Sequence, residues 1–302
     1  MSLRIGVDLG GTKIEVIALD NQGQTLARER VPTPIGDYAA TVQTIVDLVH
    51  HIEQRLGSQG SIGVAMPGAL SPATGLIKNA NSTCLIGRPL DHDLSTALQC
   101  TVKLSNDANC FALSEAVDGA AAGAAVVFGV IIGTGTGGGI AINQQVLTGI
   151  NGIAGEWGHN PLPWPQPDEL PGPRCYCGKQ GCIETFLSGP GMARDYQAAT
   201  GQSKTPHEIV ALANAGDKAA GTCLSRYTDR LARGLASIIN VLDPNVIVLG
   251  GGMSNIAQLY TEVPRLWERY VFSDRVDTVL KPAKYGDSSG VRGAAWLWPT
   301  VT

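Results

Sequence analysis

Three cysteines lie within eight residues of one another and could bind a metal ion together. Cys175, Cys177 and Cys182 form this cluster, and the turn between the last two contains two glycines. Three thiolates need a fourth ligand to complete the tetrahedral coordination of zinc. His159, 16 residues before the first of these cysteines, is the best candidate for that ligand. We therefore expect a structural Cys3His zinc site, the alternative being free or redox-active cysteines.

Three glycine-rich turns follow apolar segments and could hold phosphate groups. They occupy residues 8–13, 133–139 and 250–252. Glycine allows the backbone to approach a ligand closely and to point successive N–H groups at it, which suits a phosphate. In the first turn, Thr12 and Lys13 add a hydroxyl group and a positive charge.

Other nucleotide-binding motifs fit these turns poorly. Gly133, Gly135 and Gly138 match the pattern G-x-G-x-x-G, but the dinucleotide fingerprint requires a helix directly after it, and residues 140–143 have a strand-like sequence. A Walker A loop and the H-R-D and D-F-G motifs of protein kinases do not occur in the sequence. The remaining alternative, that the turns merely connect strands, is weaker for all three turns together than for any one.

Several carboxylates and amides stand where they could act on a hydroxyl group. Asp107 follows Asn106 at the expected junction of a strand and a helix. This position suits a general base, but it is also an ordinary place for a residue that caps a helix. Glu156 and His159 could present polar groups to a polyol. Asn79 and Asn81 offer amides for sugar hydroxyls, the alternative being that they only form a turn. Glu184 follows Cys182 by two residues, so a zinc ion there would fix its position.

The composition narrows the class of protein. The 302 residues include 22 basic and 26 acidic ones, a formal net charge of −4, so the chain is not built to coat nucleic acid or an anionic membrane. The longest apolar run, 120–132, is short of the about 20 residues that a membrane span needs. The N-terminus lacks a secretory pattern, and seven cysteines, an odd number, argue against a disulfide framework. We expect a cytoplasmic protein.

The hydrophobic pattern predicts the elements that must position these residues. In the first part of the chain it predicts strands at 3–9, 14–19, 24–31, 61–66 and 102–104 and helices at 38–56, 90–98 and 107–122. In the second part it predicts strands at 126–132, 140–147 and 246–249 and helices at 218–242, 255–270 and 290–298. Such alternation is typical of sheets covered by helices.

In their order along the chain, these motifs resemble the ROK family (repressors, open reading frames and sugar kinases). The resemblance runs nearly end to end and is carried by Asp8–Lys13, Asn106–Cys110, 133–139, Gly155–His159, Cys175–Glu184 and Gly250–Met253. It implies an α/β protein with the two-domain sugar kinase/actin/Hsp70-like (ribonuclease H-like) fold and a cleft between the domains. The expected domains are 1–120, with a C-terminal helix at 289–302 packed back on it, and 121–288, which carries the zinc-binding loop.

The resemblance also implies ATP-dependent phosphorylation of a hexose with Mg²⁺, Asp107 being the catalytic base. The implied sugar-binding residues are Asn81, Asn106, Asp107, Glu156, His159 and Glu184. The implied nucleotide and Mg²⁺ residues are Asp8, Gly10, Gly11, Thr12, Lys13, Gly133, Thr134, Gly135, Gly137, Gly138, Gly250 and Gly251. The implied ligands of a structural Zn²⁺ are His159, Cys175, Cys177 and Cys182.

The implied sugar is D-fructose, with mannose as a second hexose. Residues 78–83, 156–164 and 287–296 look most like bacterial fructokinase and mannokinase. N-acetylglucosamine and glucose kinases of the family share much of the pattern and are the alternatives. A sugar-responsive repressor of the family would need a DNA-binding segment, whereas only Met1-Ser2-Leu3 precede the first strand. We therefore expect no nucleic acid or membrane partner, and the resemblance suggests a homodimer.

The middle of the chain has two peculiarities. No lysine or arginine occurs between Lys103 and Arg174, so a phosphate bound there would be met by glycine N–H groups and Mg²⁺. The segment between His159 and Cys175 is longer and richer in proline than in many family members, so the position of His159 depends on how this segment folds.

Overall fold

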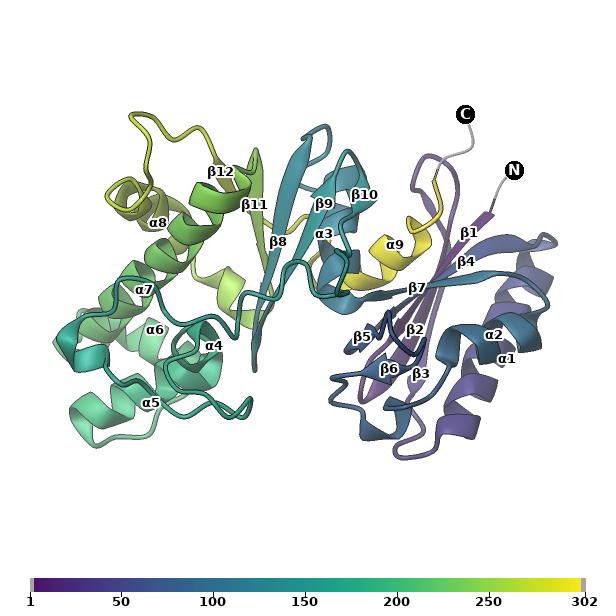
Figure 1. Ribbon diagram of the computed structural model, residues 1–302, viewed down its shortest axis with the longest axis horizontal. Helices are drawn as coiled ribbons and strands as arrows, with labels where there is room; N and C mark the ends of the chain where they lie inside the picture. Colours follow the sequence, from purple (N-terminus) through teal and green to yellow (C-terminus); the bar gives the residue numbers. More distant parts are fainter. Residues whose placement is uncertain (1–2, 300–302) are drawn as a thin grey trace. The chain divides into compact units, whose positions relative to one another are not determined.

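In a computed structural model that describes residues 3–299, the chain forms two compact units (Figure 1). The first contains residues 3–123, 139–154 and 287–299, and the second contains 124–138 and 155–286. The main difference from the predicted domains is the segment 139–154, which belongs to the first unit because the Gly139 backbone lies against that of Ala108. Residues 300–302 of the predicted C-terminal helix lie outside the described residues.

A five-stranded sheet forms the centre of the first unit. Its strands are β1 (Leu3–Leu9), β2 (Lys13–Leu19), β3 (Thr25–Pro32), β4 (Gly60–Met66) and β7 (Val102–Asn106). They are ordered β3-β2-β1-β4-β7; β1 pairs antiparallel with β2 and parallel with β4. In this register Val7 lies opposite both Val16 and Val64. The five strands agree with the predicted ones to within two residues at either end.

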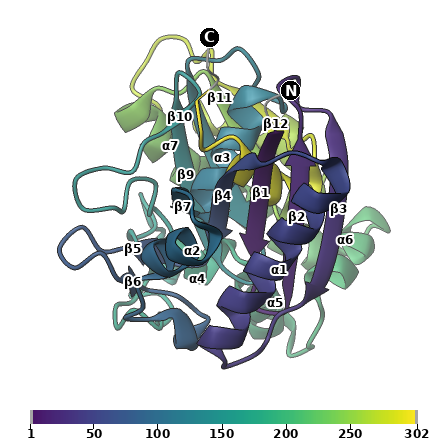
Figure 2. The same cartoon turned by 90° about the vertical axis from the view of Figure 1, so that its right-hand side faces the viewer.

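Helices cover both faces of this sheet. They are α1 (Tyr38–Leu56), α2 (Leu90–Leu98), α3 (Asp107–Val117) and α9 (Ser289–Ala295). On one face, where Figure 2 shows α1 lying across the strands, Ile45 and Val49 share a core with Val16. On the other face, Ile17 shares a core with residues of α3 and α9. Successive residues of β2 thus enter opposite cores, as the period of two in a strand requires.

The helix α9 approaches α3 and the sheet closely because glycines line the contacts. A Cβ atom added at Gly293 of α9 would lie 1.7 Å from the carbonyl oxygen of Cys110 in α3. A Cβ atom added at Gly63 of β4 would lie 2.0 Å from the carbonyl oxygen of Ala294. The position of α9 beside α3 (Figure 1) therefore depends on residues without side chains.

We expect Gly293→Ala to lower the free energy of unfolding by about 1–3 kcal/mol, the usual effect of overpacking a core. The methyl group would collide with a backbone oxygen, which cannot rotate away as a flexible side chain could. Urea unfolding followed by circular dichroism would measure the change. Gly221→Ala is the matched control: it also lies in a helix, nothing stands within 4 Å of its added Cβ, and alanine there should stabilise by up to about 1 kcal/mol. Equal stability of the two variants would contradict the argument.

The second unit is built on parallel strands and carries most of the remaining helices. The sheet to which it contributes has the order β10-β9-β8-β11-β12. Its strands are β8 (Val126–Ile132), β9 (Thr136–Ile142), β10 (Gln145–Val146), β11 (Val246–Gly250) and β12 (Val279–Pro282), of which β9 passes from the second unit into the first. The helices are α4 (Ile183–Leu187), α5 (Gly189–Thr200), α6 (Pro206–Asn214), α7 (Lys218–Leu242) and α8 (Leu259–Trp267). A two-residue pair, β5 (Ala69–Leu70) and β6 (Ile77–Lys78), belongs to the first unit.

Three predicted helices are longer than the observed ones. The helix predicted at 107–122 ends at Val117, and in the turn that follows, the Ala120 N–H donates to the Glu115 carboxylate at 2.7 Å. The helix predicted at 255–270 spans Leu259–Trp267, and the one predicted at 290–298 spans Ser289–Ala295.

The single strand predicted at 140–147 is wrong in both position and continuity. β9 begins four residues earlier, inside the expected glycine turn, and a turn at Asn143 and Gln144 separates it from β10. Both turn residues have positive φ, 50° and 59°, the backbone geometry of a tight hairpin. The glycines 137–139 are therefore strand residues.

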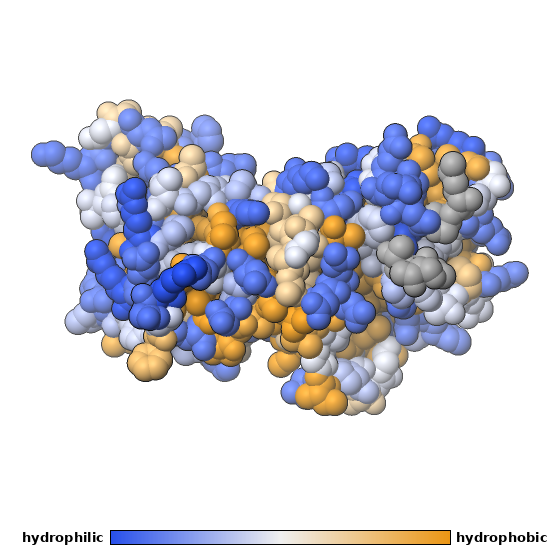
Figure 3. All heavy atoms as spheres, turned by 90° about the horizontal axis from the view of Figure 1, so that it is seen from above, coloured by the Kyte–Doolittle hydropathy of each residue, from blue (hydrophilic) through white to orange (hydrophobic). Residues whose placement is uncertain are grey.

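Polar side chains dominate the visible surface. In the space-filling view, hydrophilic residues project over most of the face shown, with apolar residues between them (Figure 3). Within residues 3–299, none of the helices combines the length and the apolar character needed to cross a membrane.

Candidate functional site

The predicted site residues fall into two groups, one in each unit. The first unit holds Asp8, Gly10–Lys13, Asn81, Asn106 and Asp107, and the second holds 133–138, Glu156, His159, Glu184, the three clustered cysteines, Gly250 and Gly251.

In the first unit, the predicted phosphate turn is the tight connection between β1 and β2. The Gly10 N–H donates to the Lys13 carbonyl oxygen at 3.0 Å, and the Thr33 hydroxyl donates to the Gly10 carbonyl oxygen at 2.8 Å. Gly11 at the tip is exposed, and a Cβ atom there would lie 3.6 Å from the Ser82 hydroxyl oxygen. These two hydrogen bonds hold the turn in place, and its tip lies near the segment that contains Asn81.

Asn106 and Asp107 lie where β7 runs directly into α3. The Asn106 side chain caps the helix by accepting from the Ala108 N–H at 2.9 Å, and its amide donates to the Gly68 carbonyl oxygen at 2.9 Å. The Asp107 carboxylate accepts from the same Ala108 N–H at 2.8 Å. Asn106 is therefore the cap, and Asp107 is the first residue of the helix.

The surroundings of Asp8 and Asp107 make it easier for each carboxylate to take up a proton. The Asp107 side chain reaches solvent, yet protein atoms crowd it enough that desolvation raises its pKa, an effect that hydrogen bonds from Ala108 and Asn106 partly offset. Desolvation, followed by the negative charges of Asp107 and Glu15, raises the pKa of Asp8 to about 7. Asp8 and Asp107 are thus close enough to repel each other, a situation that a divalent cation relieves.

In the second unit, Glu184 links the region predicted to bind sugar to the glycine turn after β8. Its carboxylate accepts from the Thr136 N–H at 3.0 Å, and its own N–H donates to the Gly158 carbonyl oxygen at 2.9 Å. A Cβ atom at Gly135 would lie 2.5 Å from the Glu184 carboxylate, and one at Gly158 would lie 2.1 Å from the Thr136 carbonyl oxygen. These glycines permit the close approach.

The buried Trp157 fixes the segment that carries Glu156 and His159. Its indole N–H donates to the Gly137 carbonyl oxygen at 3.1 Å, and its ring meets that of Phe128 edge-on with centroids 5.7 Å apart. A Cβ atom at Gly138 would lie 2.8 Å from the Trp157 ring. Gly137 and Gly138, expected at the phosphates, therefore lie in β9 and accommodate the tryptophan, while Gly133–Gly135 form the turn itself.

The structure brings together all four predicted zinc ligands. The ligand atoms of His159, Cys175, Cys177 and Cys182 all lie within 4.8 Å of one another. The Cys175 Sγ to His159 Nδ1 distance is 3.5 Å and the Cys177 Sγ to Cys182 Sγ distance is 3.6 Å. Tetrahedral zinc with ordinary Zn–S and Zn–N bonds separates its ligands by about 3.5–3.8 Å. Both the donor set and its spacing therefore fit zinc.

The thiols of this cluster would have to lose protons in order to bind zinc. Desolvation, together with the hydrogen bonds of the two neighbouring thiols, raises the pKa of Cys182 to about 12. A metal ion would displace this proton, since zinc binds the thiolate. The other ring nitrogen of His159, Nε2, lies 3.0 Å from the Tyr176 hydroxyl oxygen, which supplies the partner that a metal-bound histidine ordinarily has.

A pocket of about 680 Å³ in the second unit joins the first glycines of the turn to two helix N-termini. Its lining includes the predicted residues Gly133 and Thr134, together with Gly252 and Met253 of the third turn. The residues that sequence reasoning missed are Gly189, Pro190, Ala193, 203–206, His207 and Glu208. Two sequence features indicate these helix N-termini: the proline in the first turn of α5 and the Thr205–Glu208 capping box of α6. Helix N-termini favour anions.

Comparison with known proteins gives consistent results. The sequence pattern of the ROK family matches residues 4–301 of this chain. The N-acetyl-D-glucosamine kinase of Yersinia enterocolitica is 40% identical over 296 residues, which cover 97% of this chain and 98% of that protein. The ROK hexokinase from Thermus thermophilus has a TM-score of 0.87 and 32% identity, covering 98% and 97% of the two chains. The ROK family glucokinase from Streptomyces griseus, solved with glucose and AMPPNP, has a TM-score of 0.75 and 28% identity, covering 97% and 98%. These similarities confirm the predicted sugar kinase/actin/Hsp70-like fold class.

Proposed function

Because this chain belongs to the ROK family and its relatives are sugar kinases, we propose that it transfers the γ-phosphoryl group of ATP to the 6-hydroxyl of a hexose. The observation that carries this proposal is the Asp107 carboxylate at the start of α3, with a raised pKa and a second carboxylate, Asp8, nearby. Phosphoryl transfer depends mainly on positioning and electrostatics, so few reactive side chains are needed.

In this proposal Asp107 accepts the proton of the attacking hydroxyl group. Because desolvation raises its pKa, the Asp107 carboxylate is a stronger base than an ordinary aspartate. The Ala108 N–H holds one of its oxygens, so the orientation of the carboxylate is fixed. Asn106, held by Gly68, would bind a neighbouring sugar hydroxyl together with Asn81.

The nucleotide would be bound through its phosphates and its base by different parts of the chain. Asp8 and the turn Gly10–Lys13 fit Mg²⁺ and phosphate oxygens, because Asp8 is a crowded carboxylate and Lys13 adds a positive charge; Mg²⁺ would supply charge neutralisation when bound. The pocket of about 680 Å³ that begins at Gly133 has the size and the apolar lining expected for a nucleoside.

The remaining sugar contacts would come from Glu156, His159 and Glu184. His159 has a double role in this proposal, since Nδ1 faces the cysteines while Nε2 faces Tyr176. A sugar hydroxyl that reaches His159 must therefore share or replace the Tyr176 contact. The zinc ion would be structural, and the homodimer stays a prediction.

Two hexoses are candidates for the substrate. N-acetylglucosamine is the first candidate, because the N-acetyl-D-glucosamine kinases of Yersinia enterocolitica and Vibrio cholerae are 40% and 41% identical to this chain over 97% of its length. D-Fructose is the second candidate, supported by the resemblance of residues 78–83 and 156–164 to fructokinase and mannokinase.

A panel of sugars tests the proposal. Purified protein with Mg²⁺ and ATP should release ADP only when a hexose is present, and the product should be the 6-phosphate by NMR. We expect the highest kcat/KM for N-acetylglucosamine among N-acetylglucosamine, fructose, mannose and glucose. A higher kcat/KM for fructose would establish the second candidate, whereas sugar-independent ADP release, or none with any of the four, would refute the kinase.

A further inference from the structure

The segment 160–174 connects two of the candidate zinc ligands and is fastened along its length. At its start, Leu162 donates from its N–H to the Gly181 carbonyl oxygen at 2.9 Å. Two residues further on, the aromatic ring of Trp164 stacks on that of Tyr270 with centroids 5.2 Å apart. A 3-10 turn at Pro167–Glu169 follows and is closed by a hydrogen bond of 2.7 Å from the Gln166 N–H to the Glu169 carboxylate.

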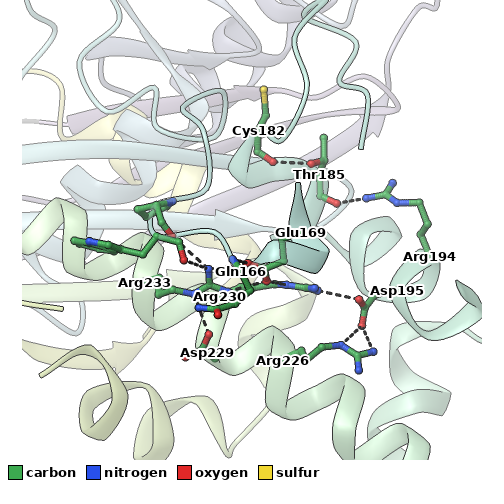
Figure 4. A network of polar contacts seen from close by, with 12 residues as sticks. Gln166, Glu169, Cys182, Thr185, Arg194, Asp195, Arg226, Asp229, Arg230 and Arg233 are labelled. Atoms are coloured by element: carbon green, nitrogen blue, oxygen red, sulfur yellow. Dashed lines mark hydrogen bonds and ion pairs between the residues drawn. The ribbon is translucent and has the colours of Figure 1, made fainter. Parts of the chain in front are cut away.

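Glu169 is the centre of a buried ion-pair network with two arginines one turn apart on α7 (Figure 4). Arg230 Nε donates to one carboxylate oxygen at 2.7 Å, and Arg233 donates to both oxygens at 2.8 Å. The side chains of Glu169 and Arg233 are only 4% and 1% exposed. Although burial alone would raise the pKa of Glu169, the hydrogen bonds from Arg233 and Arg230 hold it at about 2.

Arg233 also binds the backbone of the segment 160–174. Its guanidinium donates to the carbonyl oxygens of Pro163 and Trp164, at 3.3 Å and 2.8 Å, and its Nε donates to Asp229 at 2.9 Å. One arginine thus holds both the backbone near the start of the segment and the carboxylate near its middle. Such planar, multidentate recognition specifies position as well as adding stability.

We propose that Glu169, Arg230 and Arg233 are positioning residues that fold the segment 160–174 onto α7 and thereby bring His159 and Cys175 to within zinc-ligand distance. This inference rests on the proposed function for the part that concerns sugar binding. Without the anchor, the 15 residues between the two ligands would be held less firmly, by contacts such as the Leu162 hydrogen bond and the Trp164–Tyr270 stack, and more of the cost of closing this loop would fall on the metal. With the anchor, His159 is placed before zinc or sugar binds.

The test compares Glu169→Gln with Arg226→Gln in the zinc-loaded protein. Glu169→Gln keeps the shape of the side chain and removes the charge that pairs with both arginines. Arg226 is the control for the outer part of the network, because it lies one turn earlier on α7 and pairs with Asp195, which also pairs with Arg230, but it forms no ion pair with Glu169. The first readout is the rate of zinc transfer to a chromophoric chelator, and the second is the KM for the best hexose beside the KM for ATP.

We expect Glu169→Gln to release zinc about 10–100-fold faster, the usual effect of losing a partner that orients a metal ligand, and to raise the KM for the hexose more than that for ATP. Arg226→Gln should release zinc at the wild-type rate. If Glu169→Gln does not fold, Arg233→Lys takes its place, since it keeps the charge but loses the multidentate contact, and an intermediate release rate is expected.

Two results would overturn the inference. One is a variant that melts at a lower temperature but releases zinc at the wild-type rate, which would make the network a support for the core only. The other is a purified wild-type protein that binds no zinc. The chelator measurement needs no kinase activity, so a failure of the proposed function, with no hexose phosphorylated, leaves the zinc result able to decide.

Discussion

Asp107→Asn is expected to lower kcat by about 10²–10⁴-fold, the contribution of general-base catalysis. Asparagine has the same shape and can still accept the Ala108 N–H bond that Asp107 accepts, so the fold should not change. The loss should appear in kcat rather than in the KM for sugar, because the amide can still contact a hydroxyl group but cannot take its proton. A coupled ADP assay measures kcat, and isothermal calorimetry measures sugar binding.

Asp37→Asn is a matched control for this experiment. Asp37 is also an acidic residue at the start of a helix in the first unit, where its side chain caps α1 by accepting from the Ala40 N–H at 3.0 Å. Asparagine is an equally good cap, and we place no chemistry there, so its kcat should be that of the wild type. A kcat for Asp107→Asn within a factor of about two of the wild type, with an unchanged melting curve, would eliminate Asp107 as the base.

A pH profile adds an independent check. Because desolvation raises the pKa of Asp107, the wild-type kcat/KM should fall on the acid side as the carboxylate takes up a proton and can no longer act as a base. The residual activity of Asp107→Asn should lack this part of the profile. Asp8, whose pKa is about 7 partly because of the charge of Asp107, titrates in both proteins, and its pKa should be lower in Asp107→Asn, where that charge is gone.

The elements with strong local signals could be predicted from the sequence. The helix α1 begins and ends at the predicted residues, because Asp37 caps its start and Gly57, with φ of 64°, ends it. The helix α7 is likewise correct from Lys218 to Leu242, with Asp217 as its cap. In each case the residues that set the boundary are adjacent to it in sequence.

The glycine-rich segment 133–139 could not be resolved in this way. Nothing local distinguishes a glycine that exposes its N–H to a ligand from one that makes room for a neighbouring group. Gly138 lies against Trp157 and Gly139 against Ala108, and both contacts are distant in sequence. Gly137 and Gly138 are strand residues, and their contact with phosphate stays a prediction.

The central segment without lysine or arginine contains a buried carboxylate whose cationic partners lie far away in sequence. Residues 104–173 contain no lysine or arginine, yet Glu169 is buried within this stretch. Its partners, Arg230 and Arg233, lie 61 and 64 residues further along the chain. The sequence reveals the proline-rich segment as a departure from the family but not that α7 would hold it in place.

The second large effect concerns zinc. Cys182→Ser is expected to abolish stoichiometric zinc binding and to lower kcat/KM by about 10²-fold or more, beyond the 10–100-fold typical of losing an outer partner of a ligand. Cys182 lies two residues before Glu184 and directly before α4, and its sulfur also lies 3.5 Å from the His159 carbonyl oxygen. Losing the metal would therefore release two of the proposed sugar contacts together.

The control and the readouts separate this effect from a general loss of a cysteine. Cys100→Ser changes an exposed cysteine of the first unit and should keep wild-type zinc content and activity. Elemental analysis of the purified proteins gives zinc per chain, and melting curves with and without a chelator show how much stability the metal adds, which should vanish in Cys182→Ser. Structural zinc contributes directly to folding free energy, so a wild-type melting temperature that the chelator does not change would show that these four residues meet at zinc-ligand distances without binding the ion.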